Sequence, residues 1–194
     1  MKPALLIDFD GTLCHDRFWR SLEPNIKEKV QSFFIANKDL VNKWMRGGYI
    51  SEEINRKIAD AIFSDYNVLW DIFVNDCKTM FVSETDLRQI GELRKHFTTL
   101  LVTDNMDCFN RFTAPSLSLD AYFDSIINSF DRHVLKNDNN GQLFQEVIST
   151  TGAELSRSIL IDNSEESCKT FEKLGGKVFL VTKEKPLTHW LKLL

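Results

Sequence analysis

The run Ala4-Leu5-Leu6-Ile7, followed directly by Asp8-Phe9-Asp10-Gly11-Thr12-Leu13, decides the fold. A continuous aliphatic run that ends at polar residues is typical of a strand buried on both faces. Two carboxylates one residue apart would point to opposite faces of a continuing strand, but a turn at Gly11 brings both toward one pocket. Such a pair suits a nucleophile beside a general acid and base, and its mutual repulsion calls for a cation.

Three more apolar runs have the same character and also end at polar residues. They are Thr99–Val102, Ile159–Ile161 and Lys177–Val181. Helical periodicity over 86–97 and 142–148 separates them, so we predict an α/β fold with a Rossmann-like parallel sheet and helices on both faces. Ligands of such sheets bind at the carboxyl ends of the strands. Those ends carry Asp8, Asp10, Thr103 and Asp162.

The segment 14–83 has helical periodicity throughout and lacks a strand-like run. We therefore predict a small all-helical cap inserted after the first strand, with residues 1–13 and 84–194 forming the core. Gly47-Gly48 predicts a break between two cap helices, and Ser51 an N-cap for the next one. Ser83-Glu84-Thr85-Asp86 resembles a capping box that starts the first helix back in the core. The alternative is that the inserted helices simply cover the sheet.

Composition excludes several classes of protein. The 194 residues carry a net charge of −4 and no basic block, which argues against a nucleic-acid partner. No apolar run approaches the roughly 18 residues of a membrane span, and the first apolar run is too short for a signal peptide. Four widely spaced cysteines without a CxxC pair suggest neither a zinc site nor disulfides. We expect a cytoplasmic protein with reduced thiols and no membrane partner.

At this point the sequence resembles the haloacid dehalogenase (HAD) superfamily, whose first motif is DxDGT after a buried strand. Thr103 matches the hydroxyl of the second motif and Lys136 the lysine of the third. Asp162, with Glu166 four residues later, matches the acidic pair of the fourth. The motifs occur in the family's order. Three positions depart from the family pattern: Ile161 stands in place of Gly, Asn137 in place of Pro, and Glu166 in place of a second Asp.

The resemblance implies a mechanism and a site. Asp8 would be the nucleophile that forms an aspartyl-phosphate, and Asp10 the general acid and base. Mg²⁺ would be held by the Asp8 side chain, the Asp10 backbone carbonyl and Asp162, with Glu166 in the outer shell. The residues expected to bind the phosphate are Phe9, Thr103, Asp104 and Lys136.

The resemblance also implies a function. Because family dehalogenases lack the second aspartate, Asp10 favours a Mg²⁺-dependent phosphatase that acts on a small phosphorylated metabolite. The inserted helices would be the family's C1 cap. Arg17, Trp19 and Arg20 at its start are candidates for substrate selection, although packing within the cap is the plainer interpretation. A phosphomutase, or a non-catalytic binding or regulatory protein with the same fold, remains an alternative. We expect a monomer or a homodimer.

Overall fold

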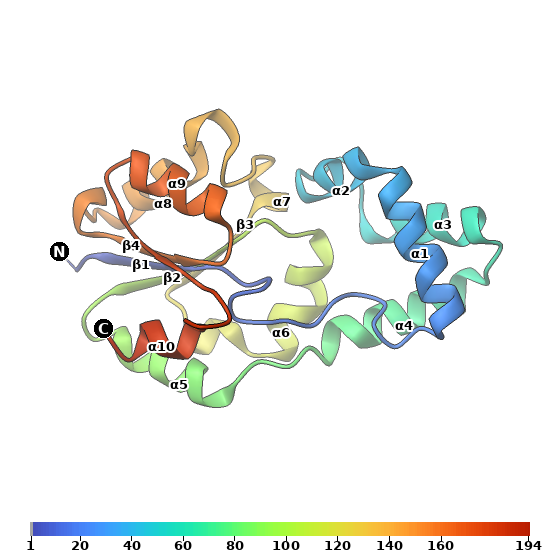
Figure 1. The fold of residues 1–194 in the computed structure, drawn as a ribbon, viewed down its shortest axis with the longest axis horizontal. Helices are drawn as coiled ribbons and strands as arrows, with labels where there is room; N and C mark the ends of the chain where they lie inside the picture. The colour runs from blue at the N-terminus through green and yellow to red at the C-terminus, as the bar shows by residue number, and fades with distance from the viewer. Residues whose placement is uncertain (1) are drawn as a thin grey trace.

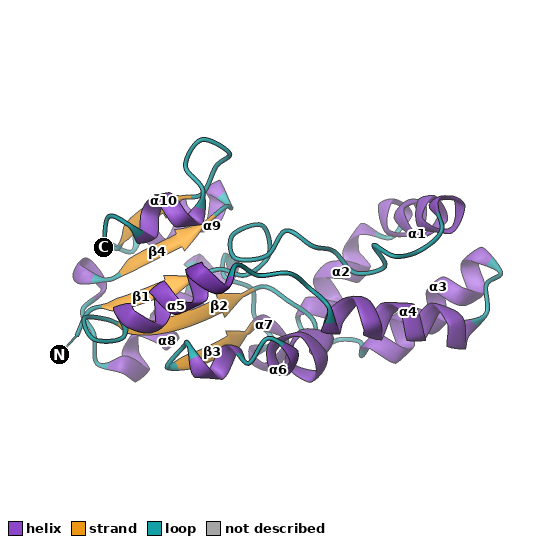
Figure 2. Cartoon of the chain, turned by 90° about the horizontal axis from the view of Figure 1, so that it is seen from below, coloured by secondary structure: helices purple, strands orange, loops and turns teal. Residues whose placement is uncertain are grey.

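The computed structural model describes residues 2–194 and contains a five-stranded parallel sheet. The strand order is β3-β2-β1-β4-β5, so β1 lies in the middle (Figure 2). The strands are β1 (Ala4–Ile7), β2 (Thr98–Thr103), β3 (Ser125–Asn128), β4 (Ile159–Asp162) and β5 (Lys177–Leu180). The predicted α/β class and four of the strands are confirmed. The sequence analysis did not identify β3, an edge strand with only two apolar residues.

Helices cover both faces of the sheet because successive residues of each buried strand point to opposite sides. Leu5 and Ile7 share a hydrophobic cluster with α5 (Glu84–Leu93) and α10 (Leu187–Leu191). Ala4 and Leu6 share another cluster with α8 (Gln142–Thr151) and α9 (Glu165–Lys173). In Figure 1, α8 and α9 lie above the sheet and α5 and α10 below it. Two short helices, α6 (Ala114–Ser116) and α7 (Ser129–Arg132), connect the remaining strands.

Four helices between β1 and β2 form a separate layer to one side of the sheet (Figures 1 and 2). They are α1 (Pro24–Ala36), α2 (Lys38–Met45), α3 (Ser51–Ile62) and α4 (Tyr66–Lys78). Their buried side chains build a hydrophobic cluster of their own, centred on aromatic residues such as Trp19, Trp44 and Phe73. The inserted helices therefore lie beside the sheet domain instead of covering a face of the sheet. The bounds 14–83 remain a prediction.

The ends of two helices differ from the sequence-based expectation. Ile50 is the N-cap of α3, and Ser51 is the first helical residue. The Ser51 hydroxyl donates to Asp107 at 2.6 Å instead of capping its own helix, because a buried carboxylate lies within reach. Ser83 caps α5 as predicted and accepts a hydrogen bond from the Asp86 amide. The helix predicted over 86–97 ends at Leu93.

Buried polar contacts join the helical layer to the sheet domain at the turn between α2 and α3. Asp107, which follows β2, accepts hydrogen bonds from Trp44 Nε1 at 2.9 Å and from Arg111 at 2.8 Å, in addition to Ser51. Arg46 forms a two-point ion pair with Asp138, with distances of 2.8 and 2.7 Å. Because each contact satisfies a donor that would otherwise be buried or poorly solvated, the turn is held firmly against the core.

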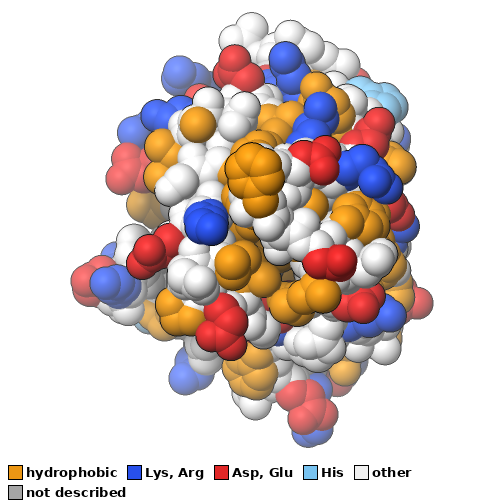
Figure 3. Space-filling model, turned by 90° about the vertical axis from the view of Figure 1, so that its right-hand side faces the viewer, with side chains coloured by type: hydrophobic (Ala, Val, Ile, Leu, Met, Phe, Trp, Pro, Cys, Tyr) orange, Lys and Arg blue, Asp and Glu red, His pale blue; other side chains and the backbone are white. Residues whose placement is uncertain are grey.

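Two findings concern the apolar runs and the cysteines considered in the sequence analysis. No helix within residues 2–194 is long and apolar enough to cross a bilayer. The cysteines at 14, 77, 108 and 168 are all free and buried. Figure 3 views the molecule from the end formed by the inserted helices and shows hydrophobic side chains interspersed with charged ones.

We predict that Asp107→Ala lowers the free energy of unfolding by about 3 kcal/mol, because Trp44 Nε1 and the Ser51 hydroxyl lose their buried acceptor. Urea unfolding measures the change. Asp60→Ala, at an exposed position on α3, is the matched control and should stay within about 0.5 kcal/mol of the parent. Equal stability of the two variants would show that Asp107 does not anchor the inserted helices.

Candidate active site

Three of the predicted site residues meet at the carboxyl edge of the sheet because β1 lies between β2 and β4. Asp8 follows β1, Thr103 ends β2 and Asp162 ends β4. All three side chains are buried. The Asp8 amide donates to Ile161 O at 3.0 Å, which continues the β1–β4 ladder and fixes the direction of the Asp8 side chain.

Lys136 joins the two buried carboxylates. Its Nζ atom lies 2.7 Å from Asp8 Oδ1 and 2.7 Å from Asp162 Oδ2, and all three side chains are at most 5% exposed. The backbone amide of Lys136 donates to Asp104 Oδ1 at 2.9 Å, which holds the loop in place. Asp104 therefore contributes its side chain as an anchor for Lys136, a role that the sequence did not suggest.

Burial and charge shift the pKa values of this group in opposite directions. Burial raises the pKa of Asp8 to about 7, while the adjacent Lys136 ammonium opposes the increase. Burial would lower the pKa of Lys136, but Asp8 and Asp162 more than offset it and hold that pKa above its ordinary value. Lys136 is therefore a fixed positive charge, and Asp8 is a carboxylate whose ionisation depends on nearby cations.

Asp10 lies near this buried group, and its side chain is 33% exposed. Asn105 Nδ2 donates to Asp10 Oδ2 at 2.7 Å, and Arg17 approaches Asp10 Oδ1 at 3.5 Å. Burial raises the pKa of Asp10 to about 6, and Arg17 counteracts part of this effect. A carboxyl group with this pKa, open to the pocket, can both give and take a proton near neutral pH.

The turn predicted at Gly11, directly after Asp10, is present in the structure. Gly11 has a φ of +85°, a left-handed conformation that disfavours other residues. The amides of Leu13 and Cys14 both donate to Phe9 O at 2.9 Å, so the chain folds back immediately after the strand. A Cβ atom on Gly11 would lie 2.4 Å from Asn163 Nδ2, because Asn163 packs directly against the turn.

Asn163 is a site residue that the sequence analysis missed. One amide heavy atom of Asn163 lies 3.0 Å from Asp10 O and 3.2 Å from Asp8 Oδ2. If that atom is nitrogen, it donates a hydrogen bond to each oxygen. If the amide is turned by 180°, the Asn163 oxygen lies next to both of these oxygens, and carboxylate, carbonyl and amide oxygens are ligands that suit Mg²⁺. The site therefore fits a hard divalent cation through one carboxylate, one carbonyl and one amide.

The metal ligands named in the sequence analysis remain a prediction. No group of three or more His, Cys, Asp or Glu side chains in the described chain is arranged to hold a metal. Asp10 offers its backbone carbonyl, while both oxygens of Asp162 are engaged, by Lys136 and by the Ser164 amide at 2.7 Å. Glu166 is exposed on the first turn of α9, and nothing in the structure supports its outer-shell role.

Several groups near Asp8 are suited to bind an oxyanion. The Thr103 hydroxyl is buried and has no hydrogen-bond partner within residues 2–194. Within the same residues, the backbone amides of Phe9, Asp10 and Asp104 donate no hydrogen bond. Unpaired buried donors are costly, so their concentration around Asp8 indicates a place for a ligand that accepts hydrogen bonds.

The three cap residues proposed for substrate selection have different surroundings. Arg17 contacts Asp10, as described above. Trp19 is buried and packs against Phe73 with ring centroids 4.6 Å apart. Arg20 points away from the site and donates to Asp76 O at 2.6 Å and to Thr79 Oγ1 at 2.7 Å. Arg20 thus packs within the helical layer, which was the alternative interpretation of its role.

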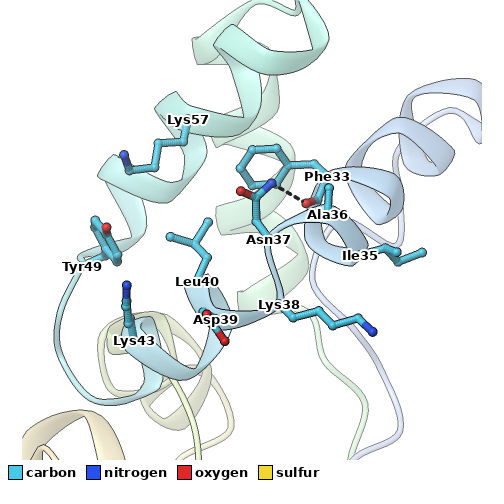
Figure 4. A pocket seen from close by; sticks show the side chains of 10 residues that line it. All are labelled: Phe33, Ile35, Ala36, Asn37, Lys38, Asp39, Leu40, Lys43, Tyr49 and Lys57. Atoms are coloured by element: carbon cyan, nitrogen blue, oxygen red, sulfur yellow. Dashed lines mark hydrogen bonds between the residues drawn. The ribbon is translucent and has the colours of Figure 1, made fainter.

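A separate cavity of about 640 Å³ opens at the turn between α1 and α2 (Figure 4). Three lysines, Lys38, Lys43 and Lys57, stand around it together with Tyr49 and Asp39. None of the site residues predicted from the sequence line this cavity. It is therefore distinct from the group around Asp8.

Solved structures share this fold and arrangement of elements. A HAD family enzyme from Bacteroides thetaiotaomicron aligns with a TM-score of 0.75 and 18% identity, covering 97% of this chain and 98% of that chain. The chain has the haloacid dehalogenase fold. A complex of the same Bacteroides enzyme with magnesium and inorganic phosphate aligns with a TM-score of 0.72 and 16% identity, covering 98% of this chain and 99% of that one.

The structure of a haloacid dehalogenase also aligns with this chain. The L-2-haloacid dehalogenase from Xanthobacter autotrophicus, with chloropropionic acid covalently bound, gives a TM-score of 0.63 and 13% identity over 95% of this chain and 80% of that one. No family model and no curated protein matches the sequence. The predicted resemblance is therefore confirmed at the level of the fold.

We predict that Lys136→Met lowers the free energy of unfolding by about 3–5 kcal/mol. The substitution removes the only cation between Asp8 and Asp162 in the described chain, so two buried carboxylates would face each other without a counter-charge. Chemical unfolding at pH 8 measures the effect. Lys169→Met, at an exposed lysine on α9, serves as the control and should change stability by less than about 0.5 kcal/mol. A similarly small change for both variants would contradict the prediction.

Proposed function

We propose that this protein is a hydrolase of the HAD type that cleaves a phosphoric monoester of a small metabolite, with Mg²⁺ as cofactor. The observation that carries the proposal is the buried Asp8–Lys136–Asp162 group beside a second carboxyl, Asp10, whose pKa burial raises to about 6. An enzyme that only displaced halide from carbon would have no use for that second acid. The neighbours with the same fold include a complex with magnesium and phosphate, which agrees with the proposal.

In the first step, an oxygen of Asp8 attacks the phosphorus and forms an aspartyl-phosphate. The bond between phosphorus and the ester oxygen breaks, and Asp10 transfers its proton to the departing oxygen. Lys136 neutralises charge on the transferring group, and Thr103 with the amides of Phe9, Asp10 and Asp104 donates hydrogen bonds to its oxygens.

In the second step, water attacks the phosphorus of the aspartyl-phosphate. Asp10, now ionised, takes a proton from the water, and the acyl phosphate bond breaks to restore Asp8 and release inorganic phosphate. Asn105 keeps the Asp10 carboxyl aimed at the pocket in both steps through its 2.7 Å hydrogen bond. Arg17 lies 3.5 Å from the other oxygen of Asp10.

Mg²⁺ would be held by Asp8 Oδ2, the Asp10 carbonyl and Asn163 Oδ1, and it would supply positive charge to the phosphoryl oxygens. Asp162 serves chiefly as the partner of Lys136 in this arrangement. The outer-shell role of Glu166, the cytoplasmic location and the monomeric or homodimeric state remain predictions from the sequence.

We predict that Asp8→Asn lowers Mg²⁺-dependent release of phosphate from a panel of monoesters by at least about a thousandfold. The amide keeps the shape of the side chain but cannot attack phosphorus. Asp120→Asn, at an exposed position, is the control for handling and folding and should retain full activity. Full activity of Asp8→Asn would overturn the mechanism, and transfer of phosphate within a sugar phosphate without its release would favour a phosphomutase.

We further predict that Asn163→Ala weakens Mg²⁺ binding by about 10- to 100-fold, since one of three proposed ligands is removed. Isothermal titration calorimetry with Mg²⁺ and the otherwise unliganded protein gives the dissociation constant without requiring turnover. Glu165→Gln, an exposed neighbour paired with Lys169, is the control. Unchanged binding by Asn163→Ala would remove Asn163 from the site, and a loss in Glu166→Gln would restore the outer-shell role of Glu166.

A further inference from the structure

A cavity of about 480 Å³ lies between the start of the inserted segment and the helices α1 and α2. Its walls come mainly from apolar and aromatic side chains, with three polar ones among them. The lining residues that matter below are Arg17, Phe18, Trp19, Phe34, Val41 and Trp44, and Met106 of the sheet domain also lines it. A cavity of this size can enclose a ring system of a small metabolite.

Two of the residues that line the cavity are linked to the proposed general acid, Asp10. Arg17, which lines it, lies 3.5 Å from Asp10 Oδ1. Met106 also lines it and directly follows Asn105, whose amide holds Asp10 Oδ2 at 2.7 Å. Asp10 protonates the oxygen of the leaving group, so the rest of that group must extend from Asp10 into neighbouring space. Arg17, which contacts the Asp10 carboxylate, and Met106, the chain neighbour of Asn105, make this cavity the candidate for that space.

The walls favour a flat and largely apolar group. Trp19 lies with its ring centroid 5.7 Å from that of Phe34 and 6.4 Å from those of Phe18 and Trp44. Rings at these distances form a rigid wall, because each aromatic side chain has only two rotatable bonds and the neighbours restrict both. Aromatic walls bind planar ligands by dispersion and by ring-to-ring contacts.

Trp19 shows two features that packing alone does not account for. Its backbone has a φ of +56°, a conformation that costs energy for a bulky residue. Its indole N–H is buried and has no acceptor within residues 2–194. A residue fixed at such cost is characteristic of ligand sites, where the geometry of a wall matters more than its stability.

We propose that this cavity receives the leaving group of the substrate, and that the substrate is the phosphate monoester of an alcohol bearing an aromatic or similarly planar apolar group. The inference rests on the proposed function, because Asp10 defines where the leaving group starts. Arg17 and Lys27, the two cations in the lining, can interact with an electronegative substituent on the ring.

The test compares 2-phenylethyl phosphate with ethyl phosphate, whose alcohols have nearly the same acidity. Because the two esters share their chemical reactivity, a difference in kcat/KM reports on recognition of the ring. We expect kcat/KM to be at least about tenfold higher for 2-phenylethyl phosphate with the parent protein. Val41→Trp, which adds bulk to a half-buried wall position, should reduce that ratio by about tenfold. Val68→Trp, on the exposed face of α4, is the control and should leave the ratio unchanged.

A binding measurement separates this inference from the proposed function. Calorimetry of Asp8→Asn with each ester and Mg²⁺ should give a dissociation constant at least about tenfold lower for 2-phenylethyl phosphate. This preference without turnover by the parent protein would support the cavity and overturn the hydrolase. Hydrolysis of both esters with equal kcat/KM, or equal binding of both, would overturn the cavity inference and leave the hydrolase standing. If Val41→Trp does not fold, the binding comparison alone decides.

Discussion

The structure depends on one buried cation, Lys136, held between the carboxylates of Asp8 and Asp162. Two ionised carboxylates at adjacent strand ends repel each other strongly when they are removed from water. The parallel order that places β1 beside β4 therefore requires a positive charge at that point. Lys136 reaches it from a loop that Asp104 anchors, so the β2 end, the β4 end and this loop form one unit.

The two oxygens of Asp8 have separate roles as a result. Oδ1 pairs with Lys136, while Oδ2 lies 3.2 Å from the Asn163 amide, which also contacts the Asp10 carbonyl. Lys136 alone does not bring the pKa of the Asp8 carboxyl back to its ordinary value, which is why burial still raises it to about 7. A second cation on the Oδ2 side would complete the compensation. The electrostatics of the folded chain thus favour a cation at the position where the proposed phosphoryl transfer would need positive charge.

The same loop also links the inserted helices to the site. Asp138 accepts hydrogen bonds from the Leu135 amide and from the Arg46 guanidinium. These bonds attach the turn after α2 to the segment that carries Lys136. Together with the buried Asp107 contacts, this ion pair fixes the position of the aromatic wall relative to Asp10. A substrate that fills the space between them would be aligned by residues from both layers, which is how a small insertion can select a substrate.

The sequence by itself determined the strands and the chemistry of their ends, because buried runs such as Ala4–Ile7 leave a local hydrophobic signal and Asp8, Asp10 and Gly11 are neighbours in the chain. Only the tertiary structure decided which distant residues contact these side chains. Lys136 meets Asp8 across 128 positions, and its sequence neighbourhood is that of an ordinary polar loop. The sequence analysis did not identify the contacts of Asn163 and Asn105 with the aspartates of the site. It also did not show that Arg20 donates to Asp76. The position of an amide or a guanidinium in the sequence does not indicate which residue it contacts. The local sequence pattern indicates which residues are buried. Contacts between distant residues depend instead on how the strands and loops are arranged in space.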